Sequence, residues 1–154
     1  MRGAIFDLDG TLADTAGDLL GAANTVLAAH GLATLDPVRD RPVAGRGGRA
    51  MLRRALEREG RHPDGPEETA LVDRLYPELL VAYEARIDAE TRLFEGVEAC
   101  LEALVASGWR VGVCTNKPEK LAHLLLDRLG VRVGFGAVLG ADTLAVRKPD
   151  PLHF

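Results

Sequence analysis

The sequence of 154 residues has few aromatic side chains, two cysteines and no long apolar segment. Aromatics make up only 5% of the chain, so we expect a core built from Leu, Val and Ala. Cys100 and Cys114 are too few for a disulfide framework, which favours a reducing cytoplasm. No apolar run approaches the roughly 20 residues of a membrane span, and the first apolar residues reach Asp7 too soon for a signal peptide. We therefore expect a cytoplasmic protein with no membrane partner.

The residues that are present have the composition of a globular protein. Hydrophobic residues account for 47% of the chain and charged residues for 27%, which argues against intrinsic disorder. The net charge of −4 and the pI near 5.6 argue against nucleic acid as a partner. The length fits one ordinary domain, or one domain that carries an insertion.

Three short apolar stretches predict β-strands over residues 3–8, 110–114 and 137–139. Residues 3–8 are apolar without alternation, which predicts a strand buried on both faces. Helical spacing of apolar residues predicts helices over 96–107 and 118–130. The alternation of strand and helix is typical of a parallel α/β sheet.

A block with no convincing strand, residues 15–92, interrupts this pattern. Helices are predicted over 15–30 and 48–59, and a third begins at Pro66. Pro77 lies inside the third helix and is expected to kink it or split it in two. The predicted fold class is α/β, with an all-helical insertion in a parallel core. The predicted core comprises residues 1–14 and 93–154, and the predicted insertion comprises residues 15–92.

Two acids mark the C-terminal end of the first predicted strand, the edge at which α/β sheets bind ligands. Alternation along the strand sends Asp7 and Leu8 to opposite faces, and a turn at Gly10 lets Asp9 swing back to the same crevice. One carboxylate can then act as nucleophile or metal ligand and the other as acid and base. The alternative, simple turn and cap residues, is disfavoured because acids in an apolar strand are costly without a task.

Two later segments carry groups that suit an anion. Thr115 and Asn116 follow the second strand directly, and Pro118 opens the next helix, whose free N–H groups would form an anion site. A plain helix cap explains these two residues equally well. Lys148 is held by the rigid prolines that follow it, Pro149 and Pro151, and could neutralise a phosphate and a carboxylate together. Taken alone, Lys148 is better explained as a solvated charge in a loop.

A fourth segment lies in the helical block. Arg46 and Arg49 are interleaved with glycines at the start of the second predicted helix, which suits an anionic substrate and equally suits a flexible loop. The four histidines are scattered and have no metal-ligand spacing. They are His30, His62, His123 and His153.

Taken together and in this order, the motifs resemble those of the haloacid dehalogenase-like (HAD-like) phosphatase superfamily. Residues 7–11 (DLDGT) are similar to its first motif, Thr115-Asn116 to its second and Lys148 to its third. The insertion over 15–92 resembles the helical C1 cap of subfamily I, so the resemblance implies a HAD-like, Rossmann-like core. The similarity spans the chain, and within the family it is greatest to the phosphoglycolate phosphatases.

The resemblance also implies roles for individual residues. Asp7 would attack phosphorus and form an aspartyl-phosphate. Asp9 would protonate the leaving alcohol and then activate water. Mg²⁺ would lie between Asp7, the backbone carbonyl of Asp9 and the phosphate. Thr115 and the N–H of Asn116 would hold the phosphoryl oxygens, and Lys148 would balance their charge.

The activity implied is Mg²⁺-dependent hydrolysis of a small phosphorylated metabolite, with 2-phosphoglycolate as the first candidate. Arg46 or Arg49 could then meet the substrate carboxylate. Dehalogenation is disfavoured because relatives with that activity lack an acid at the position of Asp9. Phosphonatase chemistry needs a cap lysine, and residues 15–92 contain none. Sugar phosphomutase remains open because it keeps both acids.

The family's fourth motif, a Gly-Asp followed by another Asp that completes the Mg²⁺ site, does not occur before Phe154. The resemblance therefore predicts that the chain corresponds to the N-terminal two thirds of such an enzyme. Strand 3–8 would then be an open edge of the sheet. An alternative is an incomplete, non-catalytic fragment that binds phosphate or a partner chain.

Overall fold

The computed structural model describes residues 2–153, and the chain divides into two compact units. The α/β unit is formed by Met1–Asp14 and Arg92–Phe154, and the helical unit by Thr15–Thr91. Residues 1 and 154, the outer bounds of the predicted core, lie outside the described residues. The boundary falls at Arg92 because this residue pairs with Asp14, where the short strands β2 (Ala13–Asp14) and β3 (Arg92–Leu93) form an antiparallel ladder.

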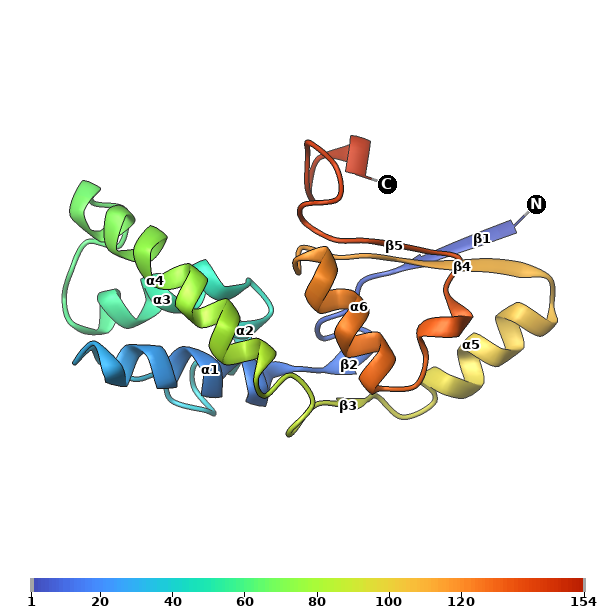
Figure 1. The fold of residues 1–154 in the computed structure, drawn as a ribbon, viewed down its shortest axis with the longest axis horizontal. Coiled ribbons are helices and arrows are strands. Elements are labelled where there is room, and N and C mark those ends of the chain that lie inside the picture. Colours follow the sequence, from blue (N-terminus) through green and yellow to red (C-terminus); the bar gives the residue numbers. More distant parts are fainter. Residues whose placement is uncertain (1, 154) are drawn as a thin grey trace. The chain divides into compact units, whose positions relative to one another are not determined.

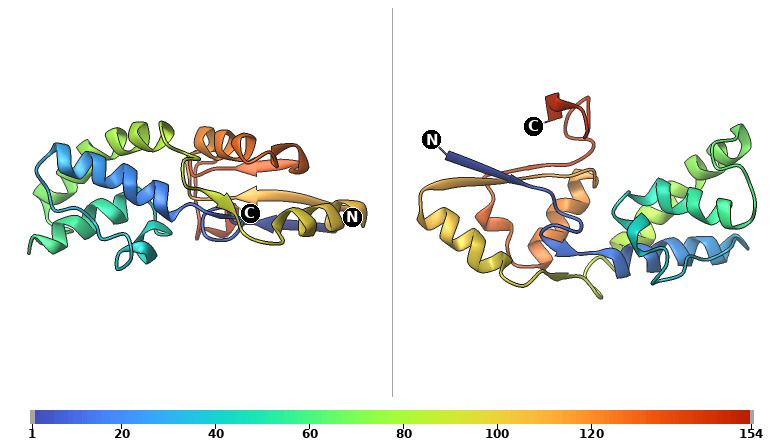
Figure 2. Two further views of the ribbon diagram at one scale, coloured as in Figure 1. Left: turned by 90° about the horizontal axis from the view of Figure 1, so that it is seen from below. Right: turned by 180° about the vertical axis from the view of Figure 1, so that it is seen from behind.

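The centre of the α/β unit is a sheet of three parallel strands, as predicted (Figure 1). Its strands are β1 (Arg2–Phe6), β4 (Trp109–Cys114) and β5 (Ala137–Leu139), in the order β1-β4-β5. Helix α5 (Val97–Ala106) precedes β4, and α6 (Glu119–Arg128) connects β4 to β5. Both helices lie on the same face of the sheet (Figures 1 and 2). Both connections, from β1 to β4 and from β4 to β5, move in the same direction across the sheet. Because such crossovers are right-handed, their helices lie on the same face.

Strand β1 lies at the edge of this sheet, as the open-edge prediction stated. The prediction that residues 3–8 form a strand buried on both faces is wrong for β1, which ends at Phe6 and is mostly exposed. Ile5 has 59% of its surface exposed, because α5 and α6 cover only one face. The core of the unit lies between the sheet and these helices. Its members include Leu8, Val111, Val113, Leu121, Leu125, Leu126 and Val138.

The helical unit contains α1 (Ala16–Ala29), α2 (Arg41–Ala44), α3 (Gly48–Arg58) and α4 (Pro66–Glu84). Helix α4 packs against α1 and α3, and its buried side chains recur at helical spacing. Of the two predicted effects of Pro77, a kink or a split, the split is wrong, since α4 runs through this residue as one helix. Pro77 and Asp73 are both exposed, so the carbonyl that proline leaves unpaired is open to water. Helix α2 was not predicted, because four residues carry no periodicity.

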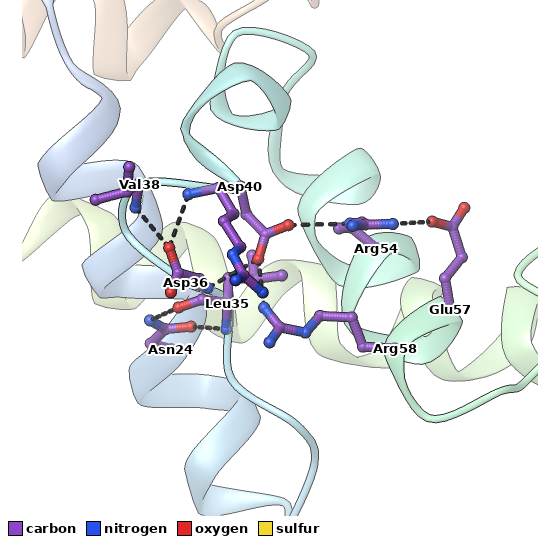
Figure 3. A network of polar contacts seen from close by, with 9 residues as sticks. Asn24, Leu35, Asp36, Val38, Asp40, Arg54, Glu57 and Arg58 are labelled. Carbon is purple, nitrogen blue, oxygen red and sulfur yellow. Dashed lines mark hydrogen bonds and ion pairs between the residues drawn. The ribbon is translucent and has the colours of Figure 1, made fainter.

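Side chains anchor the loop between α1 and α2 to the neighbouring helices (Figure 3). Asn24 receives the N–H of Leu35 on Oδ1 at 2.7 Å and donates from Nδ2 to the Leu35 carbonyl at 2.9 Å. At the end of the loop, the buried carboxylate of Asp40 accepts from Arg54 Nε at 3.0 Å and from Arg58 Nη1 at 2.6 Å. These contacts tie the loop to α1 on one side and to α3 on the other.

A second buried carboxylate joins the entry of the helical unit to its exit. Asp18 of α1 accepts from the N–H of Glu90 at 2.9 Å and from the N–H and hydroxyl of Thr91, both at 2.8 Å. Arg86 Nε lies 3.3 Å from the other oxygen. Burial raises the pKa of Asp18, but the hydrogen bonds from Glu90, Thr91 and Arg86 together hold it below its ordinary value.

None of the helices formed by residues 2–153 combines the length and the apolar character needed to cross a membrane.

Candidate active site

The chemistry-bearing residues gather at the carboxyl edge of the parallel sheet. Strand β1 ends at Phe6 and β4 at Cys114, so Asp7 and Thr115 are the first residues beyond neighbouring strands. Strand β5 ends at Leu139, and the segment that carries Lys148 follows it. Because parallel strands end at one edge, the first and last motifs meet there despite their separation along the chain.

Asp7 forms an ion pair with Lys148. The Nζ atom of Lys148 lies 2.9 Å from Asp7 Oδ1, which also accepts the N–H of Leu8 at 2.8 Å. Asp7 Oδ2 carries no hydrogen bond from residues 2–153 and is thus the freer oxygen. The Asp7 side chain is 45% exposed, because β1 ends one residue earlier. The desolvation cost expected for an acid inside a buried strand therefore does not apply to Asp7.

A tight turn after β1 brings Asp9 back to this edge. The carbonyl of Leu8 accepts the N–H groups of Thr11, Leu12 and Ala13, and Gly10 adopts a φ of 77°. A left-handed conformation of this kind favours glycine. The Asp9 carboxylate then lies 2.9 Å from Nζ of Lys117, whose side chain is only 3% exposed.

Lys117 is a site residue that the sequence analysis missed. Its signal is its position, two residues after Thr115 in the second motif, where a lysine can reach the turn after β1. A buried ammonium needs a compensating charge, and Asp9 supplies one. Each of the two acids of the first motif is thus paired with one lysine, and each lysine comes from a different motif.

Thr115 is buried, and its backbone N–H donates to the carbonyl of Leu139 at 2.9 Å. Its Oγ1 accepts the N–H of Lys117 at 3.1 Å, which leaves the hydroxyl proton available for donation to another group. The neighbouring N–H of Asn116 has no acceptor among residues 2–153. Both donors belong to the loop between β4 and α6.

The start of α6 differs from the expected anion site. The first N–H of the helix, that of Glu119, donates to Asp142 Oδ1 at 2.7 Å. A carboxylate of the chain therefore satisfies a group that we expected to be free for a ligand. The donors that remain available near this point are the hydroxyl of Thr115 and the N–H of Asn116, in the loop before the helix.

The two arginines predicted to meet an anionic substrate, Arg46 and Arg49, differ in the contacts that they make. Arg49 forms an ion pair with Asp73, and its guanidinium lies 4.5 Å from the centre of the Tyr76 ring. Arg46 is exposed, and its guanidinium has no hydrogen bond or ion pair within residues 2–153. Of the two, Arg46 is the one free to meet an anion.

The oxygen atoms of Asp7 and Asp9 suit a magnesium ion. Mg²⁺ takes oxygen ligands, keeps several waters and is held by one or two carboxylates together with substrate phosphate. Residues 2–153 hold no cluster of three or more His, Cys, Asp or Glu side chains with metal-binding geometry. Oxygen atoms from only two residues at one sheet edge fit Mg²⁺, which keeps several waters, and do not fit a closed, all-protein metal cage.

A parallel α/β sheet with paired acids, a buried threonine and a lysine at its carboxyl edge is the arrangement of one large class of hydrolases. The haloacid dehalogenase-like hydrolase family matches residues 4–154, and the chain belongs to that family.

Individual relatives narrow the similarity further. The chain is 44% identical over 151 residues to a phosphoglycolate phosphatase of Xanthomonas campestris pv. campestris (strain 8004), covering 98% of this chain and 65% of that protein. It is 43% identical over 150 residues to a phosphoglycolate phosphatase of Agrobacterium fabrum, covering 97% of this chain and 63% of that protein. The chain thus spans slightly less than two thirds of the length of these relatives.

A solved structure has the same fold. The crystal structure of a predicted phosphoglycolate phosphatase from Haemophilus somnus 129PT superposes with a TM-score of 0.84 and 26% sequence identity. The similarity covers 99% of this chain and 68% of that chain.

Proposed function

We propose that the protein is a Mg²⁺-dependent phosphomonoester hydrolase that acts on 2-phosphoglycolate through an aspartyl-phosphate intermediate. The observation that carries this proposal is the pairing of Asp7 with Lys148, at 2.9 Å, beside the pairing of Asp9 with Lys117 at the same distance. Two acids, each with a fixed cation, supply a nucleophile and an acid–base group next to positive charge for phosphate. The phosphoglycolate phosphatases that resemble the chain support the choice of substrate.

In the first step, the freer oxygen of Asp7 attacks phosphorus. A bond forms between Asp7 Oδ2 and phosphorus while the bond from phosphorus to the leaving oxygen breaks. Asp9 gives its proton to that oxygen, which departs as an alcohol. Thr115 Oγ1 and the N–H of Asn116 donate to the phosphoryl oxygens, and the Lys148 ammonium stabilises their negative charge.

In the second step, Asp9 is a carboxylate and accepts a proton from water. The water oxygen bonds to phosphorus, and the bond from phosphorus to Asp7 breaks. Phosphate leaves, and both acids return to their starting forms. Lys117 Nζ lies 2.9 Å from Asp9 Oδ1, and its N–H donors hold the Asp9 side chain in place whether that side chain is protonated or ionised.

The residues that would hold Mg²⁺ are Asp7, through its carboxylate, and Asp9, through its backbone carbonyl. When bound, the ion neutralises charge on the phosphate and aligns the group for attack. The ligand set on the chain consists of oxygens alone, which is the set that Mg²⁺ prefers.

We further propose that the helical unit takes the part of the cap and that Arg46 binds the substrate carboxylate. The guanidinium fork matches a carboxylate in shape and charge. Arg46 is preferred to Arg49, because Arg49 is engaged with Asp73 and Tyr76. The variant Arg46→Ala should raise KM for 2-phosphoglycolate about tenfold and change kcat little, as expected for the loss of one charged hydrogen bond.

The control for Arg46 is Arg74→Ala, which removes an exposed arginine of α4 and should leave KM unchanged. The measurement is steady-state kinetics with 2-phosphoglycolate and with a phosphomonoester that has no carboxylate. An equal effect of Arg46→Ala on both substrates would contradict the assignment.

The test of the reaction compares phosphate release by the full gene product that contains these residues with release by Asp7→Asn. We expect Asp7→Asn to lower kcat about 10³-fold or more, because an amide cannot serve as the nucleophile. Asp127→Asn, an exposed substitution on α6, is the matched control and should retain wild-type turnover. Equal phosphate release by Asp7→Asn and the wild type would contradict the proposal. A requirement for a sugar bisphosphate would assign the protein to the phosphomutases instead.

A further inference from the structure

His153 is a completely buried polar side chain that the proposed reaction does not use. It belongs to the short 3₁₀ turn η2 (Pro151–His153), five residues after Lys148. A fully buried imidazole must find partners for both ring nitrogens or pay for their desolvation. The partners of His153 are all at the carboxyl edge of the sheet.

The two ring nitrogens of His153 span two segments of this edge. Nδ1 accepts the backbone N–H of Lys148 at 3.1 Å, and Nε2 lies 3.0 Å from the carbonyl oxygen of Gly140. A carbonyl only accepts, so Nε2 carries the proton and Nδ1 is the acceptor. These partners assign the neutral Nε2–H tautomer. A thiol, that of Cys114, donates to the His153 carbonyl at 3.5 Å and adds a third contact.

The Gly140 end of this bridge is a rigid anchor. A Cβ atom at Gly140 would lie 2.3 Å from the backbone nitrogen of Glu119 and 2.8 Å from the carbonyl oxygen of Lys117. The next residue, Ala141, donates its N–H to the same Lys117 carbonyl at 2.9 Å. Gly140 is thus packed against the loop that follows β4. The His153 ring, which is hydrogen-bonded to the Gly140 carbonyl, is therefore positioned relative to that loop.

The other side of the Lys148 peptide is held as well. Asn116 Nδ2 donates to the carbonyl oxygen of Lys148 at 3.2 Å. Both backbone polar groups of Lys148 therefore have side-chain partners, His153 on the N–H and Asn116 on the carbonyl. The backbone of a loop is ordinarily hydrogen-bonded to water, so this arrangement restricts the lysine at its Cα atom.

We propose that His153 is a positioning residue that fixes the backbone of Lys148 so that the lysine ammonium meets Asp7. The inference rests on the proposed phosphatase function for its kinetic consequence. The imidazole does not touch the substrate. It acts by joining the Lys148 N–H to the anchored Gly140 carbonyl, with Asn116 as the second point of attachment. Displacement of a charged group by about 1 Å can cost about 10²-fold in rate.

The kinetic test uses the full gene product and three variants at one position. His153→Leu removes both ring nitrogens at similar volume and should lower kcat about 10- to 100-fold with little change in KM. His153→Asn places an amide oxygen near the position of Nδ1 and should recover a large part of the loss. His153→Gln places its amide near Nε2 and should recover less. His62→Leu removes an exposed histidine and serves as the matched control, with wild-type kinetics.

A double-mutant cycle tests whether His153 acts through Lys148. Once the ammonium is removed by Lys148→Met, adding His153→Leu should lower kcat no further than about twofold. A full multiplicative loss in the double variant would overturn the proposal, as would wild-type kcat in His153→Leu. If His153→Leu does not fold, the cycle is run with His153→Gln, with the same two criteria.

A spectroscopic measurement separates this inference from the reaction itself. The ¹⁵N chemical shifts of the His153 ring should report a protonated Nε2 and an unprotonated Nδ1, and the Lys148 amide should be protected from hydrogen exchange. A proton on Nδ1, or rapid exchange of the Lys148 amide, would overturn the proposal. If the wild type hydrolyses no phosphomonoester, the proposed function fails, and the ring tautomer and amide protection still decide the positioning role.

Discussion

At the scale of single residues, the site depends on two lysines whose environments differ. Lys148 is partly exposed beside Asp7, whereas the side chain of Lys117 is 3% exposed and lies 2.9 Å from Asp9. A buried ammonium is stable only with a close anion, and its attraction to that anion is strong because little water screens it. Lys117 therefore restricts where the Asp9 carboxylate lies.

The contact between Lys117 and Asp9 predicts the effect of Lys117→Met, which keeps the unbranched stem of the side chain and removes its charge. We expect kcat for phosphate release to fall about 10- to 100-fold, because a displaced acid–base group loses part of its contribution of about 10²- to 10⁴-fold. Lys120→Met, an exposed substitution three residues further along, is the control and should have wild-type kcat. Unchanged kcat in Lys117→Met would show that Asp9 does not depend on this lysine.

At the scale of elements, the helical unit begins and ends at one buried carboxylate. Asp18 lies in the first turn of α1, and the N–H groups that it accepts belong to Glu90 and Thr91, the last residues before β3. The entry and exit of the chain are thereby joined without any strand pairing inside the unit. Hydrogen bonds to a carboxylate stabilise the fold most when that carboxylate is ionised.

The pH dependence of unfolding tests this contact. The pKa of Asp18 is lower in the folded chain than its ordinary value of 3.8, so its contribution is fully present above pH 3.8 and is lost as the pH falls below it, through the folded pKa. At pH 7, Asp18→Asn should reduce the free energy of unfolding by about 2–3 kcal/mol. Urea unfolding followed by circular dichroism should show this difference shrinking below pH 3.8.

Asp127→Asn, which alters an exposed carboxylate, provides the comparison and should have a nearly constant free energy of unfolding relative to wild type. A difference between Asp18→Asn and wild type that grows as the pH falls from 5 to 3 would contradict the assigned sign.

At the scale of the whole molecule, most of the candidate site residues belong to one of the two units. The paired acids, the buried threonine and both lysines belong to the α/β unit, where parallel strands bring their ends to one edge. The helical unit contributes Arg46, which we propose for the substrate carboxylate. We therefore expect the proposed reaction to depend on the α/β unit and on the Mg²⁺ ion proposed for its edge.

Metal removal tests that expectation. Treatment of the full gene product with EDTA should lower turnover of 2-phosphoglycolate about 10²-fold or more, and added Mg²⁺ should restore it. Ca²⁺ should restore less, because it is larger and adopts looser coordination. Asp7→Asn should remain inactive at every Mg²⁺ concentration. Full turnover by metal-free protein would contradict the proposed cofactor.

Much of the fold could be predicted because it depends on local patterns. Helices α1, α3, α4, α5 and α6 and all three strands of the parallel sheet have clear apolar periodicity or apolar runs. Helix α2 and the β2–β3 ladder were missed, since elements of two to four residues carry no such signal. The sequence predicts that β1 lies at an open edge of the sheet, and it does. The sequence does not predict that one face of β1 is exposed to solvent, because the hand of the crossovers decides which face the helices cover.

The site was predictable in part for the same reason. Asp7, Asp9 and Lys148 were found by their motifs, and Asp7 and Lys148 lie together as an ion pair. Lys117 and His153 were missed because their partners, Asp9 and the Lys148 N–H, are distant in sequence or belong to the backbone. An isolated histidine near apolar residues gives no sign of which groups will surround it.

The sequence by itself determined the strand and helix alternation, the helical insertion and the chemical groups at the strand ends, because each is written in local spacing and residue type. Only the tertiary structure decided which lysine meets which acid, that Asp142 satisfies the first N–H of α6, and that His153 spans Gly140 and Lys148. Those pairings depend on distances between segments that the chain brings together only when the parallel strands align and the core excludes water.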